Sequence, residues 1–274
     1  MWVAAAIVLL VVVAWPTPGR PRGRPLFRHT GPQWRRGYGR RAFLRLGTAL
    51  GVAAVLVYSG ADEAFERWHT GTLDPREGRA EAVRDEMRAE GRKREANRLK
   101  TESFPSSASD RVAQVAKPLG EREWFFIWGV AGLADWLWRT NPASRWARAN
   151  FEAMCVGLPM LWTVQRVLGS NRPSSHDGSP RWRPFQHANA ASGHAFLGAI
   201  PLWTLARRLR PRWASAAAGA LGTLTGWSRI NDRKHYLSQV ILGWTIAYNA
   251  VDATEATRQD ARSGDVEAST GSDG

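Results

Sequence analysis

Five apolar runs occupy the second half of this 274-residue chain, and they constrain its fold more than any other feature. Few of them alternate polar and apolar residues as a half-exposed strand would, and most lack a polar face at helical spacing. Such segments form helices that are buried in a protein core or in a bilayer. We therefore predict an all-α fold, a helical bundle embedded in a membrane. The runs are Trp124–Trp138, Phe151–Leu168, His194–Ala206, Trp213–Trp227 and His235–Val251.

Basic residues gather in the segments that connect the apolar runs. Lys and Arg outnumber Asp and Glu by 38 to 24, which gives a net charge of +14. The arginines neither line one amphipathic face nor alternate with aromatic residues, so we expect a membrane partner and no nucleic-acid partner. A compact soluble bundle remains the alternative, because small residues permit close helix packing in both settings.

Two apolar segments precede the bundle. Residues 2–15 are apolar but shorter than the roughly 20 residues that span a bilayer. The pair Arg40-Arg41 is followed by the apolar run 46–58 and by Ser59-Gly60-Ala61, a pattern that resembles a twin-arginine export signal. A retained anchor with a basic cytoplasmic flank explains the pattern equally well. Either interpretation places residue 62 onwards on the external, periplasmic side of a bacterial inner (plasma) membrane.

We divide the chain into four regions. Residues 1–61 form an anchor or export signal, 62–119 a charged external connector, 120–252 the helical domain and 253–274 a disordered polar tail. Charges of both signs alternate from Arg76 to Glu102, as on a solvated helix. A helix that binds a partner is the alternative for this connector.

Three motifs in the helical domain supply the groups that phosphate chemistry requires. They read Gln165–Pro173, Ala191–His194 and Ser228–Gln239. Two guanidiniums can hold a phosphoryl group, one histidine can attack phosphorus, and a second can protonate the leaving oxygen. The residues that carry these groups are Arg172, Ser192, Gly193, His194, Arg229 and His235.

The order and spacing of the motifs resemble the type 2 phosphatidic acid phosphatase (PAP2) superfamily, whose fold is related to that of vanadium haloperoxidases. The family motifs are Lys-x6-Arg-Pro, Pro-Ser-Gly-His and Ser-Arg-x5-His-x3-Asp, and the resemblance covers about residues 120–252. It implies a PAP2-like helical bundle in which His235 is the nucleophile, forming a phosphohistidine, and His194 is the general acid. It also implies that Arg172, Ser192, Gly193 and Arg229 bind the substrate phosphate, together with Gln165 at the lysine position.

Three positions depart from the family motifs. Gln165 replaces Lys, Ala191 replaces Pro and Gln239 replaces Asp. Gln239 lies one helical turn after His235, so its carbonyl can accept the imidazole proton, but a neutral amide cannot balance an imidazolium. Arg181 and Arg183 could supply the cation missing at Gln165, although exposed loop charges are the plainer interpretation.

The resemblance therefore implies a metal-independent phosphatase, without a cofactor, that hydrolyses a phosphomonoester or diphosphate of a lipid-like substrate. A non-catalytic relative that binds phosphate or lipid headgroups is the main alternative, and haloperoxidation is a third. His176, Asp177 and His187 share a loop, but their spacing matches no standard metal site, so we predict none. The single cysteine, Cys155, is expected to be a small buried residue.

Overall fold

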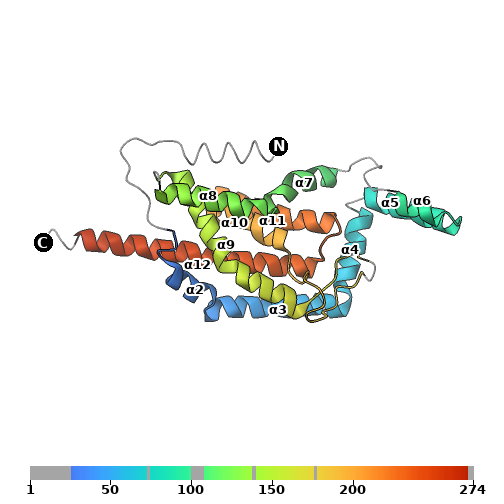
Figure 1. The fold of residues 1–274 in the computed structure, drawn as a ribbon, viewed down its shortest axis with the longest axis horizontal. Coiled ribbons are helices and arrows are strands. Elements are labelled where there is room, and N and C mark those ends of the chain that lie inside the picture. The colour runs from blue at the N-terminus through green and yellow to red at the C-terminus, as the bar shows by residue number, and fades with distance from the viewer. Residues whose placement is uncertain (1–25, 73–74, 100–107, 138–139, 176–177, 271–274) are drawn as a thin grey trace.

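The computed structural model describes residues 26–72, 75–99, 108–137, 140–175 and 178–270, and all regular elements in these ranges are helical (Figure 1). The predicted all-α fold is confirmed. The elements are α2 (Thr30–Gly37), α3 (Arg40–Ser59), α4 (Ala61–Thr72), α5 (Pro75–Ala89), α6 (Lys93–Arg98), α7 (Ala108–Ala116), η2 (Lys117–Gly120), α8 (Glu123–Leu137), α9 (Pro142–Leu168), α10 (Gly193–Ala206), α11 (Arg212–Asn231) and α12 (Leu237–Thr270). The apolar segment 2–15, His176 and Asp177 lie outside the described residues.

The core lies where α9, α10 and α12 meet. Its largest fully buried side chains include Met154, Phe196, Ile200, Leu242 and Ile246. The helices approach closely because small residues stand at their contacts. A Cβ atom at Gly243 of α12 would lie 2.5 Å from the carbonyl oxygen of Ser192, so a larger residue there would push α12 away from the start of α10.

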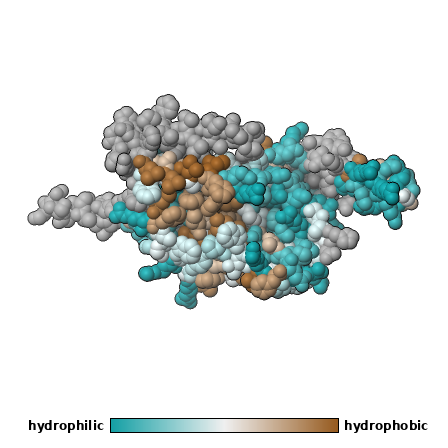
Figure 2. Space-filling model, in the orientation of Figure 1, coloured by the Kyte–Doolittle hydropathy of each residue, from teal (hydrophilic) through white to brown (hydrophobic). Residues whose placement is uncertain are grey.

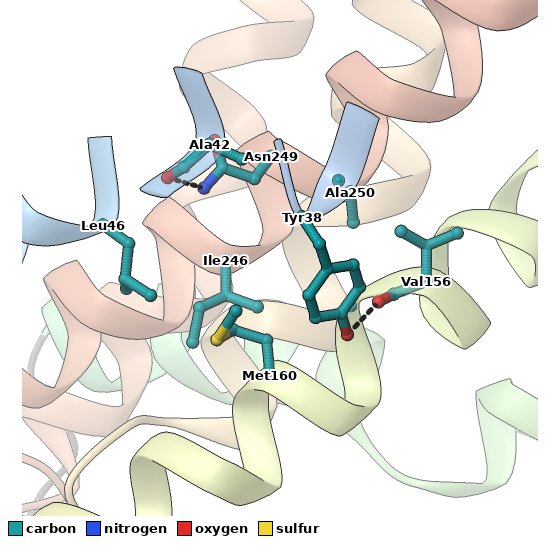
Figure 3. Close-up of a pocket in the computed structure, with 10 residues that line it drawn as sticks. Tyr38, Ala42, Leu46, Val156, Met160, Ile246, Asn249 and Ala250 are labelled. Carbon is teal, nitrogen blue, oxygen red and sulfur yellow. Dashed lines mark hydrogen bonds between the residues drawn. The ribbon is translucent and has the colours of Figure 1, made fainter. Parts of the chain in front are cut away.

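Helix α3, which contains the apolar run of the predicted anchor or export signal, is packed into the bundle. Asn249 Nδ2 of α12 donates to the carbonyl of Ala42 at 3.0 Å, and Arg45 pairs with Asp252 at 2.8 Å. Between α2 and α3, the Tyr38 hydroxyl donates to the carbonyl of Val156 at 2.9 Å, beside a small, mainly apolar pocket (Figure 3). Helix α3 is therefore part of the packed structure and contacts α12.

Apolar side chains also face outwards. Within the described residues, Thr30–Ser59 is the one helical stretch long and apolar enough to cross a membrane. A hydrophobic surface covers α8, whereas α5 and α6 are hydrophilic (Figure 2). Large exposed apolar surfaces mark sites of membrane or protein contact. The exposed residues on α3 and α8 include Phe43, Leu44, Val52, Val55, Tyr58, Phe126, Val130, Leu133, Trp136 and Leu137.

The last helix extends beyond the end that the apolar pattern predicted. That pattern ends at Val251 and predicted a disordered tail from 253, but α12 continues to Thr270. Ala253, Thr254 and Glu255 are buried, and Arg208 pairs with Glu255 at 2.5 Å. Polar side chains that pair with neighbouring elements therefore prolong a helix whose apolar signal has stopped.

The segment predicted as a connector, residues 62–119, contains α4 to α7. Helices α5 and α6 project from one end of the bundle (Figure 1). Helices α4 and α7 instead bury polar residues, with Asp62 0% exposed and Asp110 1% exposed. Two helices of the connector are thus part of the packed structure.

Candidate active site

The three motifs meet at one end of the bundle. The first spans the C-terminal end of α9, the second forms the start of α10, and the third joins α11 to α12. Backbone hydrogen bonds tie them together. The Ser192 amide donates to the carbonyl of Gln239 at 2.9 Å, and the amide of Ser174, just after motif one, donates to the carbonyl of Arg233 at 3.2 Å. The tertiary structure therefore assembles residues that lie up to about 70 positions apart.

His235 is buried in the loop just before α12, two residues before the helix begins at Leu237. Its Nδ1 lies 2.8 Å from Gln239 Oε1, as the four-residue spacing predicted. The loop closes back on α11, because the amides of Lys234 and His235 both donate to the carbonyl of Arg229, at 2.9 Å and 3.1 Å. His235 is thus held in place both by a hydrogen bond to its ring and by a hydrogen bond from its backbone amide.

The orientation of the Gln239 amide follows from its other partners. Gln239 Nε2 donates to the carbonyl of Asn171 at 2.7 Å and lies 2.9 Å from Ser170 Oγ. A carbonyl only accepts hydrogen bonds, so the amide nitrogen must face Asn171. Gln239 Oε1 then accepts from the Tyr236 amide at 3.2 Å and from His235. His235 Nδ1 consequently carries the proton, and Nε2 keeps its lone pair.

The environment also keeps the His235 ring neutral. Burial and the positive charges of Arg229 and Arg172 lower the pKa of His235 to about 3, although the hydrogen bond to Gln239 opposes the shift. A neutral imidazole with a free Nε2 is the form that attacks an electrophile. The free nitrogen of His235 therefore belongs to an uncharged ring beside two cationic side chains.

The two arginines differ in their surroundings. Arg229 is largely buried, and its Nη1 lies 3.2 Å from Asp232 Oδ2. Its Nε is buried without a hydrogen-bond partner among the described residues. Arg172 is exposed, and its Nε donates to the neutral Asn189 Oδ1 at 3.0 Å. Both guanidiniums therefore retain capacity to bind an anion.

Motif two forms the N-terminus of α10. Ser192 caps this helix, because its Oγ accepts the Ala195 amide at 3.3 Å. Gly193 is the first helical residue, and a helix supplies no internal acceptor for the amides of its first turn. Gln165 Nε2 donates to the carbonyl of Ala191 at 2.8 Å. The residue at the lysine position thus holds motif two, and the first-turn amides can bind an anion.

A carboxylate from outside the motifs faces His194. His194 Nε2 lies 3.4 Å from Glu121 Oε2, at the end of η2. Burial and the nearby Arg229 lower the pKa of His194, while Glu121 opposes this shift. A carboxylate beside an imidazole favours the protonated form, which a general acid needs.

The structure adds residues that the motifs did not indicate. Ser170 and Asn171 orient Gln239, and Glu121 faces His194. The first two lie inside motif one, so their position was a usable signal, but nothing in the sequence pointed to Glu121. Arg181 and Arg183 lie in the loop that leads to motif two. Within the described residues, no group of three His, Cys, Asp or Glu side chains could hold a metal ion.

Residues 138–259 match the family model of the PAP2 superfamily, which is of the phosphatase type. The match contains all three motifs and confirms the resemblance to this superfamily over the matched segment. Helices α2 to α8 precede it. Comparisons with curated proteins and with solved structures found no match.

Proposed function

We propose that this protein is a metal-independent phosphatase that hydrolyses a phosphomonoester or diphosphate of a lipid-like substrate. The observation that carries the proposal is the hydrogen-bond chain from Asn171 through Gln239 to His235. It leaves the Nε2 lone pair of a neutral, buried imidazole available between two arginines and a helix N-terminus. That arrangement combines a nucleophile with binding groups for the phosphoryl oxygens.

The reaction would proceed in two displacements. His235 Nε2 forms a bond to phosphorus while the bond from phosphorus to the leaving oxygen breaks, and His194 donates a proton to that oxygen. Arg172 and Arg229 bind the phosphoryl oxygens, with Ser192 and the Gly193 amide as further donors. Water, deprotonated by His194, then attacks the phosphohistidine, releasing inorganic phosphate and restoring His235. Gln165 supports this site by holding the carbonyl of Ala191.

One observation favours the non-catalytic alternative. The partner of His235 is a neutral amide, so the imidazolium character that develops at the ring has no counter-charge. Replacing the acid by its amide in the serine-protease triad lowers turnover by about 10⁴, although cysteine proteases function with Asn. We therefore expect slow but measurable turnover.

The test is release of inorganic phosphate from phosphatidic acid and from an isoprenyl diphosphate in detergent micelles, with and without a metal chelator. The proposal expects release that the chelator leaves unchanged. Binding of orthovanadate without release from any lipid or soluble phosphate would instead identify a phosphate-binding relative. Oxidation of halide by the vanadate-loaded protein would identify a haloperoxidase.

We further propose a membrane location, with the site on the external, periplasmic face of a bacterial inner membrane. Support comes from the candidate span Thr30–Ser59 and from the position of the arginines. Arg45, Arg207 and Arg208 all lie at the end of the bundle away from the motifs, and cytoplasmic ends of membrane helices carry such charges. An alkaline phosphatase reporter fused after about residue 110 should be active, because that enzyme works only outside the cytoplasm. If it is inactive and a reporter that works only in the cytoplasm is active at the same position, the orientation is the reverse.

A further inference from the structure

Helix α4 bonds to the loop that carries His235, although it lies outside the PAP2 match. Asp62, in the first turn of α4, is 0% exposed. Its Oδ1 accepts the backbone amide of Ser238 at 3.0 Å, and its Oδ2 accepts the Ser238 hydroxyl. Ser238 is the second residue of α12, so Asp62 satisfies an amide that the helix itself cannot pair. A carboxylate at this position also interacts favourably with the helix dipole.

A second residue of α4, Glu66, bonds to the loop itself. Glu66 Oε1 accepts from Arg233 Nε at 2.7 Å, and both side chains are mostly buried. Arg233 has a φ of +52°, a left-handed conformation that is uncommon for a residue with a side chain. Its carbonyl accepts the amide of Ser174, the residue that directly follows motif one. The ion pair thus stabilises a strained residue on which motifs one and three meet.

His235 lies between these two attachments. Arg233 precedes it by two residues and Ser238 follows it by three, and one helical turn of α4 separates their partners, Asp62 and Glu66. Among the described residues, neither carboxylate makes a hydrogen bond or ion pair with the imidazole, whose Nδ1 partner is Gln239. What α4 supplies is the placement of the loop, and with it the direction of His235 Nε2.

We propose that Asp62, assisted by Glu66, is a positioning residue for His235, so that α4 is part of the catalytic apparatus. The proposal rests on the assignment of His235 as the nucleophile. A displacement of about 1 Å in a reacting group can cost about a hundredfold in rate. A helix cap that serves stability alone would leave the turnover of folded enzyme unchanged.

The experiment compares Asp62→Ala, Asp62→Asn and Glu66→Gln in the full chain. Asn can accept the Ser238 amide and donate to its hydroxyl, so Asp62→Asn should stay within a few-fold of wild type. Asp62→Ala should lose about tenfold or more in kcat with KM unchanged, and Glu66→Gln should lose less. The matched control is Asp85→Asn, which alters an exposed carboxylate of α5 that pairs only locally with Arg88.

A readout that does not need turnover separates this proposal from the proposed function. In protein labelled with ¹⁵N-histidine, the Nδ1 proton of His235 should give a slowly exchanging signal, assigned by its loss in His235→Ala. Folded Asp62→Ala should lose that protection, and Asp62→Asn should keep it. An unchanged signal or an unchanged kcat in folded Asp62→Ala would overturn the positioning role. If Asp62→Ala does not fold, Ser238→Ala takes its place. It removes the hydroxyl bond and keeps the backbone bond, so the losses should be smaller, and an unchanged signal and kcat in this variant would overturn the positioning role.

Discussion

The two ends of the bundle use arginine differently. At the end away from the motifs, arginines pair with carboxylates of the chain. At the end that carries the motifs, Arg172 and Arg229 keep N–H donors that no carboxylate accepts. Arg148, for example, lies 2.9 Å from the fully buried Asp135 and 3.8 Å from Glu152. Arg229 makes one ion pair, with Asp232, and its buried Nε has no hydrogen-bond partner among the described residues. The same side chain therefore serves helix packing at one end and, in our proposal, binds phosphate at the other.

The largest effect should come from removing the proposed nucleophile. His235→Ala should reduce phosphate release by at least about 10³-fold, equivalent to about 4 kcal/mol in the activation barrier. Rates of the purified variant and detection of an acid-labile, base-stable phosphoenzyme in wild type measure this. The control is His187→Ala, which should retain activity because His187 lies in the loop before motif two and belongs to none of the motifs. Survival of more than a few per cent in His235→Ala would remove it from the nucleophile role.

The next effect tests the paired end of the bundle. Arg148→Ala leaves the Asp135 carboxylate buried without its ion-pair partner, so unfolding free energy should fall by about 3–5 kcal/mol. Urea denaturation gives the value. Arg36→Ala removes an exposed pair with Asp260 and should cost about 1 kcal/mol or less. Equal losses in the two variants would contradict the distinction between buried and surface pairs.

A third prediction concerns acid. The pKa of His235 is lowered to about 3 in the folded protein and is near 6.5 in the unfolded chain. The stability that comes from a neutral His235 is therefore complete above pH 6.5 and is lost as the pH falls towards 3. When the pH falls from 7.5 to 5, titration of His235 alone should lower the free energy of unfolding by about 2 kcal/mol. The measurement is the free energy of unfolding against pH for wild type and His235→Ala. The difference between the two curves isolates the contribution of His235, because all other groups titrate in both proteins. Parallel stability curves would show that His235 is not held neutral by burial.

The smallest expected effect concerns the amide partner of His235. Gln239→Asp restores a carboxylate on the same helix face and should raise kcat at least about tenfold, equivalent to about 1.4 kcal/mol in the barrier. Gln239→Asn is the control for side-chain length, because Asn is as short as Asp but carries no charge. A folded Gln239→Asp variant with no gain would mean that a step other than formation of the imidazolium limits the rate.

Much of the fold could be read from local patterns. The five apolar runs predicted α8 to α12, because a helix interior needs a continuous apolar face whatever it packs against. The capping box of Asn141 and Ser144, which starts α9 nine residues before the predicted run, is equally local. The pattern failed at the end of α12, where buried Glu255 and Thr257 continue the helix through contacts that no local window contains.

The sequence by itself determined the helices, the motif residues and the closeness of His235 to Gln239, because these depend on spacings of a few residues along one chain segment. Only the tertiary structure decided which way the Gln239 amide points, which carboxylate faces His194, and what holds the start of α12. Those answers come from Asn171, Glu121 and Asp62, which are separated from their partners by 68, 73 and 176 residues. Hydrogen bonds of a few ångströms depend on where folding places two groups, and no spacing along the chain encodes that position.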